Sequence, residues 1–300
     1  MTPAAAEAAH ARVTLVTVSY NSAAVLSGLL ESVPPGVTVV VVDNGGTDDT
    51  SDVAARHGAR LRRLDSNHGF GRGCNAGAAL ADTEFLFFVN PDARLDAGCV
   101  EALVAFMDAH PDASAANPRI VKPNGKTEFK RRSILVPRAE WLSHGPPEAD
   151  APIIVLLGGA IFVRRLAFEA VGGFDPAIFL YHEDDDISVR LRRQCGPVWF
   201  VPGAQARHMA GHSSGRSPKV AAFKGYHMAR SRIYALAKHG GRWPWLRTFA
   251  NALIGLLLPH NLLSARRRAK HLGQLRGAWS ARADGGAYRA PLPATGPSKS

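Results

Sequence analysis

The sequence predicts an α/β protein built on a mostly parallel, doubly wound sheet. Within the first 120 residues, short β-branched runs alternate with helix-type segments, as in chains that fold into stacked β-α-β units. The first run, residues 13–18, is almost continuously β-branched, which is typical of a strand that is buried on both faces. The chain has 300 residues, of which 46% are hydrophobic, so it is long enough for one large domain or two modest ones with an apolar core.

The first strand of this sheet covers residues 13–18, and Ser22 then caps a helix that ends at about residue 32, before Pro34 and Pro35. A second strand covers 37–42. A helix from Asp48 or Thr50 to about residue 58, a strand at 60–64, a glycine-rich segment at 67–77 and a strand at 84–89 complete this half.

The second half is less regular. Proline and glycine recur through residues 122–150, which predicts a loop-rich segment that lies over a site. After it we expect strands at 153–157 and 160–163, helices at 164–171 and 187–194, a last strand at 198–201, helices beyond Pro218, and a loose tail at 291–300.

Charge is distributed unevenly along the chain. The net charge is +11, but residues 201–300 hold 17 Lys and Arg against the single acid Asp284, whereas residues 1–200 hold 19 basic and 24 acidic residues. A basic tail on a mildly acidic body indicates a polyanionic partner, either a nucleic acid or an anionic membrane face. Simple solvation of the tail is the competing interpretation.

No run of 18 or more apolar residues occurs, which argues against a transmembrane span. The longest candidate, residues 249–263, is interrupted by Pro259 and followed by basic residues, so we interpret it as an interfacial or core helix. The three cysteines are too few and too scattered for a disulfide framework. The N-terminus does not resemble a secretory signal, and we expect a cytoplasmic chain.

Four adjacent acids, Glu183 to Asp186, follow His182. Adjacent residues on a helix point about 100° apart, so the four carboxylates cannot all serve one site. An acidic helix start favoured by the macrodipole is the structural interpretation. The functional interpretation is that one or two of them face a cleft and take a proton from an attacking hydroxyl.

Other candidate residues follow the strands, where open α/β sheets bind ligands. Asp92, at the end of an apolar strand, suits Mg²⁺ or Mn²⁺ together with substrate phosphates, although Asn-Pro-Asp is also a common turn. Asp43 follows the second strand, and Arg72 lies in the glycine-rich segment, where it could meet a diphosphate. His208 and His212 lie four residues apart in a predicted loop, which is weak support for zinc.

Taken together, these motifs resemble family 2 glycosyltransferases that use nucleotide-diphospho-sugars and invert the anomeric centre. The resemblance covers about residues 12–215 and rests on the order of several motifs. They are VSYN at 18–21, VVDNGGTD at 41–48, NHGFGRGCNAG at 67–77, FVNPDA at 88–93, GGAIFVRR at 158–165, GGFD at 172–175 and YHEDDDISVRL at 181–191.

The resemblance implies a GT-A fold with a nucleotide-sugar-binding half at 12–120 and an acceptor half at 121–215. A flexible N-terminus at 1–11 precedes it, and a basic helical region at 216–290, able to associate with a membrane, follows it. The resemblance implies roles for nine residues: Tyr20 stacks on the base, Asp43 accepts its imide N–H, Arg72, Asn75 and Asn90 contact the donor, Asp92 and His208 hold the metal, and Asp184 is the catalytic base beside Glu183.

The implied reaction is a single displacement in which Asp184 deprotonates the acceptor hydroxyl. Asn90 stands where many members have a first acid, as in the rhamnosyltransferase-like branch, which favours dTDP-L-rhamnose as donor over a UDP-sugar. The implied acceptor is a glycan or a polyprenyl-diphosphate-linked sugar in bacterial cell-surface synthesis, reached from the inner face of the plasma membrane. The alternatives are a non-catalytic glycosyltransferase-like domain, against which Asp43, Asp92 and Asp184 argue, and a nucleic-acid-binding protein, which the apolar residues of 246–263 disfavour.

Overall fold

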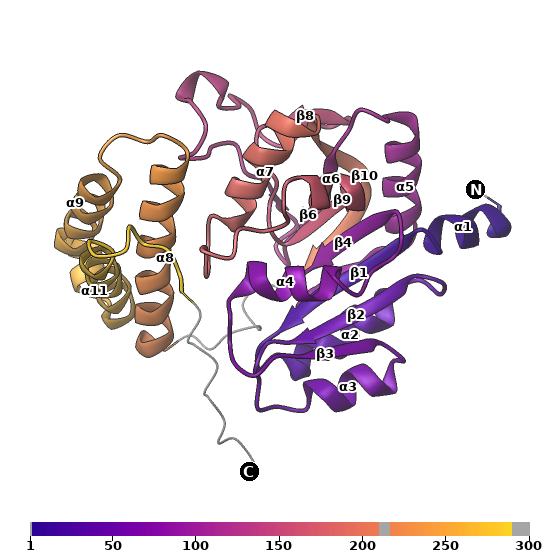
Figure 1. Cartoon of the computed structure of the whole chain (residues 1–300), viewed down its shortest axis with the longest axis horizontal. Helices are drawn as coiled ribbons and strands as arrows, with labels where there is room; N and C mark the ends of the chain where they lie inside the picture. Colours follow the sequence, from indigo (N-terminus) through magenta and orange to yellow (C-terminus); the bar gives the residue numbers. More distant parts are fainter. Residues whose placement is uncertain (1, 210–216, 290–300) are drawn as a thin grey trace, which may run out of the picture.

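A computed structural model of the protein describes residues 2–209 and 217–289. Ten strands within these residues form one mixed sheet in the order β3-β2-β1-β4-β9-β6-β10-β5, with β7 beside β6 and β8 beside β10 (Figure 1). The strands are β1 Val13–Ser19, β2 Thr38–Asp43, β3 Arg60–Arg63, β4 Phe85–Val89, β5 Ala93–Leu95, β6 Ala115–Val121, β7 Thr127–Glu128, β8 Ala151–Ile153, β9 Ala160–Arg164 and β10 Val198–His208.

Helices cover the sheet, and a C-terminal helical unit stands beside it (Figure 1). None of the helices in the described ranges is both long and apolar enough to cross a bilayer. The helices are α1 Pro3–His10, α2 Ala23–Ser32, α3 Thr50–Arg56, α4 Phe70–Ala78, α5 Cys99–Ala109, the 3₁₀ turn η1 Arg138–Glu140, α6 Arg165–Ala170, α7 Glu183–Gln194, α8 Pro218–Lys238, α9 Pro244–Leu257, α10 Pro259–Leu262 and α11 Ala265–Ser280.

The predicted α/β sheet is confirmed, and its first half is parallel. β1 pairs in parallel with β2 and β4, and β2 pairs in parallel with β3. Side chains alternate along each strand, so Leu15 packs in one apolar cluster with α5, whereas Val16 and Val18 pack in another with α4. All seven residues of β1 are buried, which explains why its sequence holds no charged residue.

The glycine-rich segment contains helix α4. Its glycines let the helix approach the sheet closely, because a Cβ at Gly73 would lie 2.7 Å from Cγ1 of Val18. The missing side chains thus make room for β1.

The second half of the sheet mixes directions, and several elements differ from prediction. β9 runs antiparallel to β4 and β6, and β10 extends past residue 201 to His208 with an irregular register after Val201. α7 begins at Glu183, so the acidic run is the first turn of the helix expected at 187–194, whereas β8 covers 151–153 rather than 153–157. α1 occupies most of the segment that we predict to be a flexible N-terminus.

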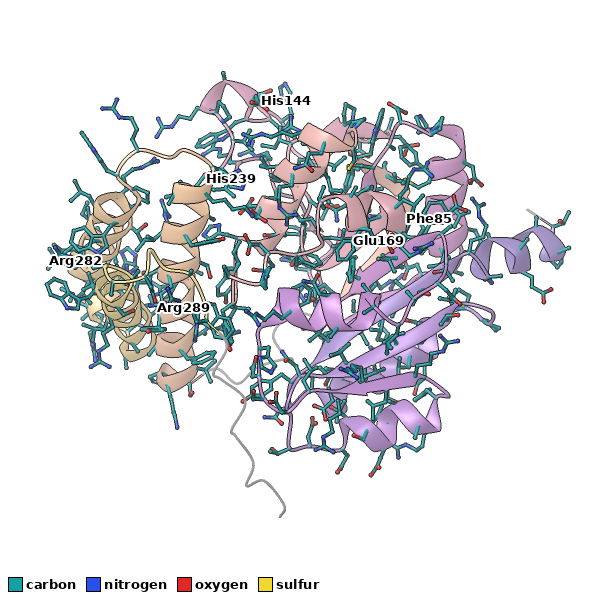
Figure 2. All side chains as sticks on the ribbon, viewed as in Figure 1. Phe85, His144, Glu169, His239, Arg282 and Arg289 are labelled. Atoms are coloured by element: carbon teal, nitrogen blue, oxygen red, sulfur yellow. The ribbon has the colours of Figure 1, made fainter. Side chains whose placement is uncertain are left out.

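The helical C-terminal region is confirmed as α8 to α11, in which α8 packs along α11. The side chains of this unit are drawn in Figure 2, where Arg282 lies at its outer edge and His239 lies at the end of α8 nearest α7. The expected tail at 291–300 lies outside the described residues.

Candidate active site

A cavity of about 410 Å³ opens at the carboxyl ends of β1 and β4, and we call it the sheet-edge cavity. This is the place where open α/β sheets bind ligands. Tyr20 lies in its wall and is 46% exposed, so its ring is accessible to a planar ligand. The other lining residues are Val18, Asn21, Ser22, Asn44, Asn67, Gly69, Phe70, Asn90, Pro91, Asp92, Phe179, Leu180, Val220, Phe223 and Lys224.

Asp43 lies behind this wall and shapes it. Its buried side chain accepts a hydrogen bond from the Gly46 N–H at 2.8 Å, and its other oxygen lies 3.5 Å from Nε of Arg63. Asn21 accepts from the Thr47 N–H at 2.8 Å, so the turn after β2 is tied to the residue that follows Tyr20. The next residue, Asn44, lines the cavity itself.

Asp92 is 1% exposed and lies at the floor of the same cavity. One of its oxygens is 3.3 Å from Nε2 of His208, and Nδ1 of His208 is 3.2 Å from Glu128. The hydrogen bonds to Asp92 and then to Glu128 raise the pKa of His208 to about 10, so the ring is an imidazolium at neutral pH. The structure therefore places His208 against Asp92, although more than 100 residues separate them in the sequence, and Asn90 lines the same cavity as Asp92.

These residues fit a divalent cation that is held mainly by substrate phosphates. No group of three or more His, Cys, Asp or Glu in the described chain is arranged as a complete metal site. One buried carboxylate beside a cavity suits Mg²⁺ or Mn²⁺, which use one or two protein carboxylates plus phosphate oxygens. His208 could bind a metal only after losing its proton. His212, the other half of the weak zinc pair, lies outside the described residues.

Asn75 and Arg72 do not line the sheet-edge cavity. The Asn75 amide donates to the Phe174 carbonyl at 2.7 Å and accepts from the Phe174 N–H at 2.9 Å. Arg72 donates to the Pro176 carbonyl at 2.8 Å, and its guanidinium lies over the Tyr288 ring. Both side chains therefore fasten α4 to the segment that leads into the acidic run.

The four carboxylates of the acidic run have different environments, because they point in different directions from the first turn of α7. Glu183 is buried against α4, near Gly71. Burial, together with the charge of Asp184, raises the pKa of Glu183 to about 8. Glu183 lines neither this cavity nor the next one.

Asp184 faces a second cavity of about 330 Å³, which we call the helix-side cavity. Its Oδ2 accepts from Nζ of Lys130 at 3.0 Å and from the Gly158 N–H at 3.2 Å. Lys130 also lies 2.9 Å from Asp185. The other lining residues lie directly before α7 or on the C-terminal helices. They are Tyr181, His182, Met228, Ala229, Arg232, Thr248, Asn251, Ala252, His271 and Gln274.

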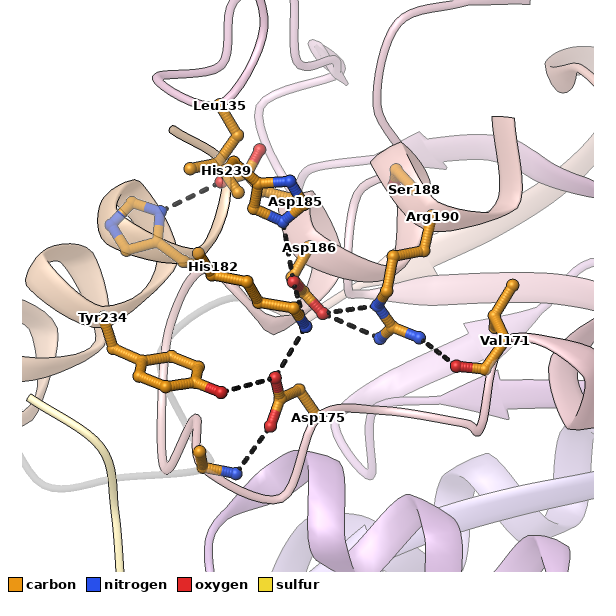
Figure 3. A network of polar contacts seen from close by, with 12 residues as sticks. Leu135, Val171, Asp175, His182, Asp185, Asp186, Ser188, Arg190, Tyr234 and His239 are labelled. Atoms are coloured by element: carbon orange, nitrogen blue, oxygen red, sulfur yellow. Dashed lines mark hydrogen bonds and ion pairs between the residues drawn. The ribbon is translucent and has the colours of Figure 1, made fainter. Parts of the chain in front are cut away.

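Asp185 and Asp186 are held by cations. Burial acts to raise the pKa of Asp185, but the hydrogen bond from His182 and the charge of Lys130 lower it to about 2. Asp186 is fully buried and joins α7 to the end of α8 through its contacts with Arg190, Lys238 and His239 (Figure 3).

Three residues in or next to these cavities had no signal in the sequence. Lys130 lies in the irregular segment 122–150, Glu128 in the short strand β7, and Lys224 among many basic residues of α8. They stand out from other charged residues only by their positions in the fold. Lys130 lies beside Asp184, Glu128 lies beside His208, and Lys224 lines the sheet-edge cavity.

Comparison with known proteins agrees with the motif order. Residues 14–172 match the model of the family described as Glycosyl transferase family 2. The N-acetylglucosaminyl-diphospho-decaprenol L-rhamnosyltransferase of Mycobacterium tuberculosis (strain H37Rv) is 29% identical over 296 residues, which cover 85% of this chain and 95% of that protein. The low-salt glycan biosynthesis hexosyltransferase Agl10 of Haloferax volcanii is 21% identical over 193 residues, 60% of this chain and 61% of that protein.

Solved structures resemble the fold at low sequence identity. TarS (residues 1–349) of S. aureus in complex with UDP is 16% identical and has a TM-score of 0.55, with 94% of each chain covered. The mannosyltransferase PcManGT of Pyrobaculum calidifontis in complex with GDP-Man and Mn²⁺ is 16% identical and has a TM-score of 0.56, with 90% of this chain and 87% of that chain covered. These likenesses confirm the fold that the motifs imply.

Proposed function

The chain belongs to glycosyl transferase family 2 and is a glycosyltransferase, and from this premise we propose that it moves a sugar, with inversion, from a nucleotide-diphospho-sugar to a lipid-linked acceptor. The arrangement of the two cavities carries the proposal. Phe179 and Leu180 line the sheet-edge cavity, whereas Tyr181 and Asp184 line the helix-side cavity. A donor and an acceptor bound in these cavities meet at the start of α7.

The sheet-edge cavity is the proposed donor site. The accessible Tyr20 ring stacks on the nucleobase, and Asp43, tied to the neighbouring turn, is the acceptor for its imide N–H. Asn90 contacts the sugar-diphosphate end of the donor. Arg72 and Asn75 act on the donor site by fixing the position of α4 against residues 174–176.

Mg²⁺ or Mn²⁺ is the proposed cofactor. Asp92 would hold the ion together with the donor diphosphate, and His208 would join only in its neutral form. When bound, the ion supplies positive charge that stabilises the leaving diphosphate.

Asp184 is the proposed general base. It takes the proton of the acceptor hydroxyl while that oxygen forms a bond to the anomeric carbon. The bond from this carbon to the diphosphate oxygen breaks, and its electron pair leaves with the diphosphate on the opposite face. One displacement of this kind inverts the centre. Lys130 and the Gly158 N–H orient the Asp184 carboxylate, and the buried Glu183 carboxyl positions the first turn of α7.

The preferred donor is dTDP-L-rhamnose, with a UDP-sugar as the alternative. The relative from M. tuberculosis, whose name specifies an L-rhamnosyltransferase, supports the sugar. The same name supports a polyprenyl-diphosphate-linked sugar as acceptor, and we place the reaction in bacterial cell-surface glycan synthesis.

A thermal-shift panel tests the donor site. We would measure unfolding with dTDP, UDP, GDP or CMP, each with and without Mg²⁺ or Mn²⁺, for the wild type, Asp92→Ala and the isosteric Asp92→Asn. A ligand present at 100 times its Kd stabilises the folded state by about 2.7 kcal/mol. We expect metal-dependent stabilisation by dTDP or UDP that both variants lose. A lack of response to all four nucleotides would contradict the donor-site assignment.

The enzyme is proposed to work in the cytoplasm, on the inner face of the plasma membrane. Exposed apolar side chains cluster on α9 and α10, among them Leu257 and Leu263, which are 63% and 88% exposed. Exposed arginines at 266–268 follow directly at the start of α11. An apolar tip beside basic residues is the composition that binds an anionic leaflet.

A further inference from the structure

The helix-side cavity continues into a groove of about 680 Å³ between residues 133–141 and α9, which we call the α9 groove. Arg232 and Asn251 line both hollows, so they are joined past these two side chains. Arg138 and Arg247 line the far part of the α9 groove. A ligand extending from Asp184 therefore meets Arg232 first and Arg247 next.

Arg232 and Arg247, unlike Lys130, have no acidic partner among the described residues. Nε of Arg232 is buried and has no hydrogen-bond partner, and neither Arg232 nor Arg247 forms an ion pair with any residue of the described ranges. Burial and the nearby charge of Arg247 lower the pKa of Arg232. Thr248 Oγ1 and His271 Nδ1, which belong to residues lining the helix-side cavity, are also buried without partners.

Two neighbouring guanidinium groups without a carboxylate indicate a polyanionic ligand. Arginine presents several N–H groups in a planar fork that matches phosphate oxygens. The donor diphosphate is not this ligand, because Lys224 at the sheet-edge cavity lies eight residues before Arg232 on α8, which corresponds to about 12 Å along a helix.

Beyond the arginines the surface becomes apolar. Leu246 lines the α9 groove and is 53% exposed, and Leu253, Ile254 and Leu257 are also exposed on α9. Their spacing of seven, eight and eleven residues from Leu246 places them on one side of the helix. Along the surface, the Asp184 carboxylate is thus followed by the guanidinium groups of Arg232 and Arg247. Next comes the row of exposed apolar residues on α9, which we call the α9 stripe.

We propose that Arg232 and Arg247 form a subsite for the diphosphate of the acceptor, with its sugar at Asp184 and its lipid chain along the α9 stripe. This inference rests on the proposed function, which supplies an acceptor of that composition. It assigns acceptor recognition to the C-terminal helices, outside the residues that match the family model.

Two acceptors distinguish this subsite from a general effect on folding or catalysis. One is a short-chain N-acetylglucosaminyl-diphospho-prenol, and the other is octyl N-acetylglucosaminide, which lacks phosphate. We would compare the wild type, Arg247→Gln and Arg232→Gln with Arg242→Gln, whose exposed guanidinium lies over Trp243 and does not line the groove. Arg232→Lys serves as a milder change if Arg232→Gln does not fold.

Binding of each acceptor is measured by calorimetry on enzyme saturated with its donor nucleotide, and transfer is measured separately. Charge-assisted hydrogen bonds of this kind predict a tenfold to hundredfold weaker Kd and higher KM for the diphosphate-linked acceptor in Arg247→Gln and in the Arg232 variant. The Kd for the octyl glycoside should stay within about twofold of the wild-type value in every variant. The Kd and KM of Arg242→Gln should stay within about twofold of the wild-type values for both acceptors.

Equal losses for both acceptors, or no loss for either, would overturn the subsite. So would a wild type that binds the diphosphate-linked acceptor no more tightly than the octyl glycoside. The wild type could also bind the diphosphate-linked acceptor, and the Arg232 and Arg247 variants bind it more weakly, without any transfer of sugar. That result would support the subsite and contradict the proposed reaction.

Discussion

At the residue scale, the acidic run shows how one turn of helix assigns four carboxylates to four environments. Glu183 is buried and retains its proton at neutral pH, Asp184 faces a cavity, and Asp185 and Asp186 are ionised against cations. A carboxylate that serves as a base must be accessible to its substrate. Asp184 and Asp185 both line the helix-side cavity and both contact Lys130, but the Asp184 side chain is 14% exposed, whereas that of Asp185 is 3% exposed and also bonds to His182.

Asp184→Asn removes the proposed base without changing the size of the side chain. We expect kcat to fall by about 10²–10⁴-fold, the usual contribution of a positioned general base. Calorimetric binding of the donor nucleotide should be unchanged, since Asp184 does not line the sheet-edge cavity. Unchanged turnover would remove Asp184 from the mechanism.

Glu183→Gln should change the response of stability to pH. Because the folded-state pKa of Glu183 is raised to about 8 from its usual 4.5, its contribution to stability is complete below pH 4.5 and is lost as the pH rises through 8. The variant has no carboxyl group at this position, so its stability does not fall in this way. Thermal unfolding should give similar Tm values at pH 5 and a higher Tm for the variant at pH 9, by about 2–4 °C for each kcal/mol. The same difference at both pH values would contradict the assignment.

The motif order made Asp92 and Asp184 predictable as site residues, because each follows a recognisable apolar or acidic segment. Lys130 was not predictable, since residues 122–150 have no periodicity and nothing in the sequence pairs position 130 with 184. The roles of Arg72 and Asn75 depend on contacts with residues 174–176, about one hundred positions away, and such contacts are visible only in the fold.

At the scale of elements, α4 depends on glycine for its distance from the sheet. Gly73→Val places a branched side chain where a Cβ alone would lie 2.7 Å from Val18. Overpacking of this kind costs about 1–3 kcal/mol, and we expect a corresponding decrease in the free energy of unfolding measured in urea. Ala79→Val, at the exposed end of the same helix, is the matched control. Equal stability of the two variants would show that the close approach is unimportant.

β1, β2 and β4 were predictable because their sequences are almost entirely β-branched or aromatic. β6 was not, since its sequence AANPRIV contains alanine, asparagine and proline. It forms a strand because it lies between β9 and β10 in the sheet, and position in a sheet outweighs intrinsic strand preference.

At the scale of the whole molecule, Asp186 fastens the C-terminal helical unit to the sheet domain. Asp186→Asn leaves Arg190, Lys238 and His239 without their shared carboxylate. Breaking a buried pair costs about 3–5 kcal/mol. Burial opposes ionisation, but His239 and Arg190 lower the pKa of Asp186 to about 2, so the stabilisation is present above pH 4 and disappears as the pH falls towards 2.

Denaturant unfolding at pH 7 and pH 2.5 measures this effect. Glu169→Gln, which breaks the exposed pair with Arg165, is the control and should cost less than about 0.5 kcal/mol. A loss for Asp186→Asn no greater than that of the control would show that the network does not join the two parts.

The basic, apolar tip formed by α9, α10 and the start of α11 predicts binding to membranes. We expect the enzyme to float with vesicles that contain phosphatidylglycerol and not with vesicles of phosphatidylcholine alone. Replacing Arg266, Arg267 and Arg268 with Gln should reduce binding by about 1 kcal/mol per residue. Retention of full binding by this variant would contradict an electrostatic contribution from α11.

The helix α8 borders both cavities, with Lys224 at one and Arg232 at the other. One additional residue between them would turn the second side chain by about 100° and shift it by 1.5 Å relative to the first. Insertions and deletions within this span should therefore disable sugar transfer even where the helix still forms. The length of α8 between these two positions thus sets the spacing of the two cavities, so a change of acceptor preference along α8 is expected from substitutions rather than from insertions or deletions.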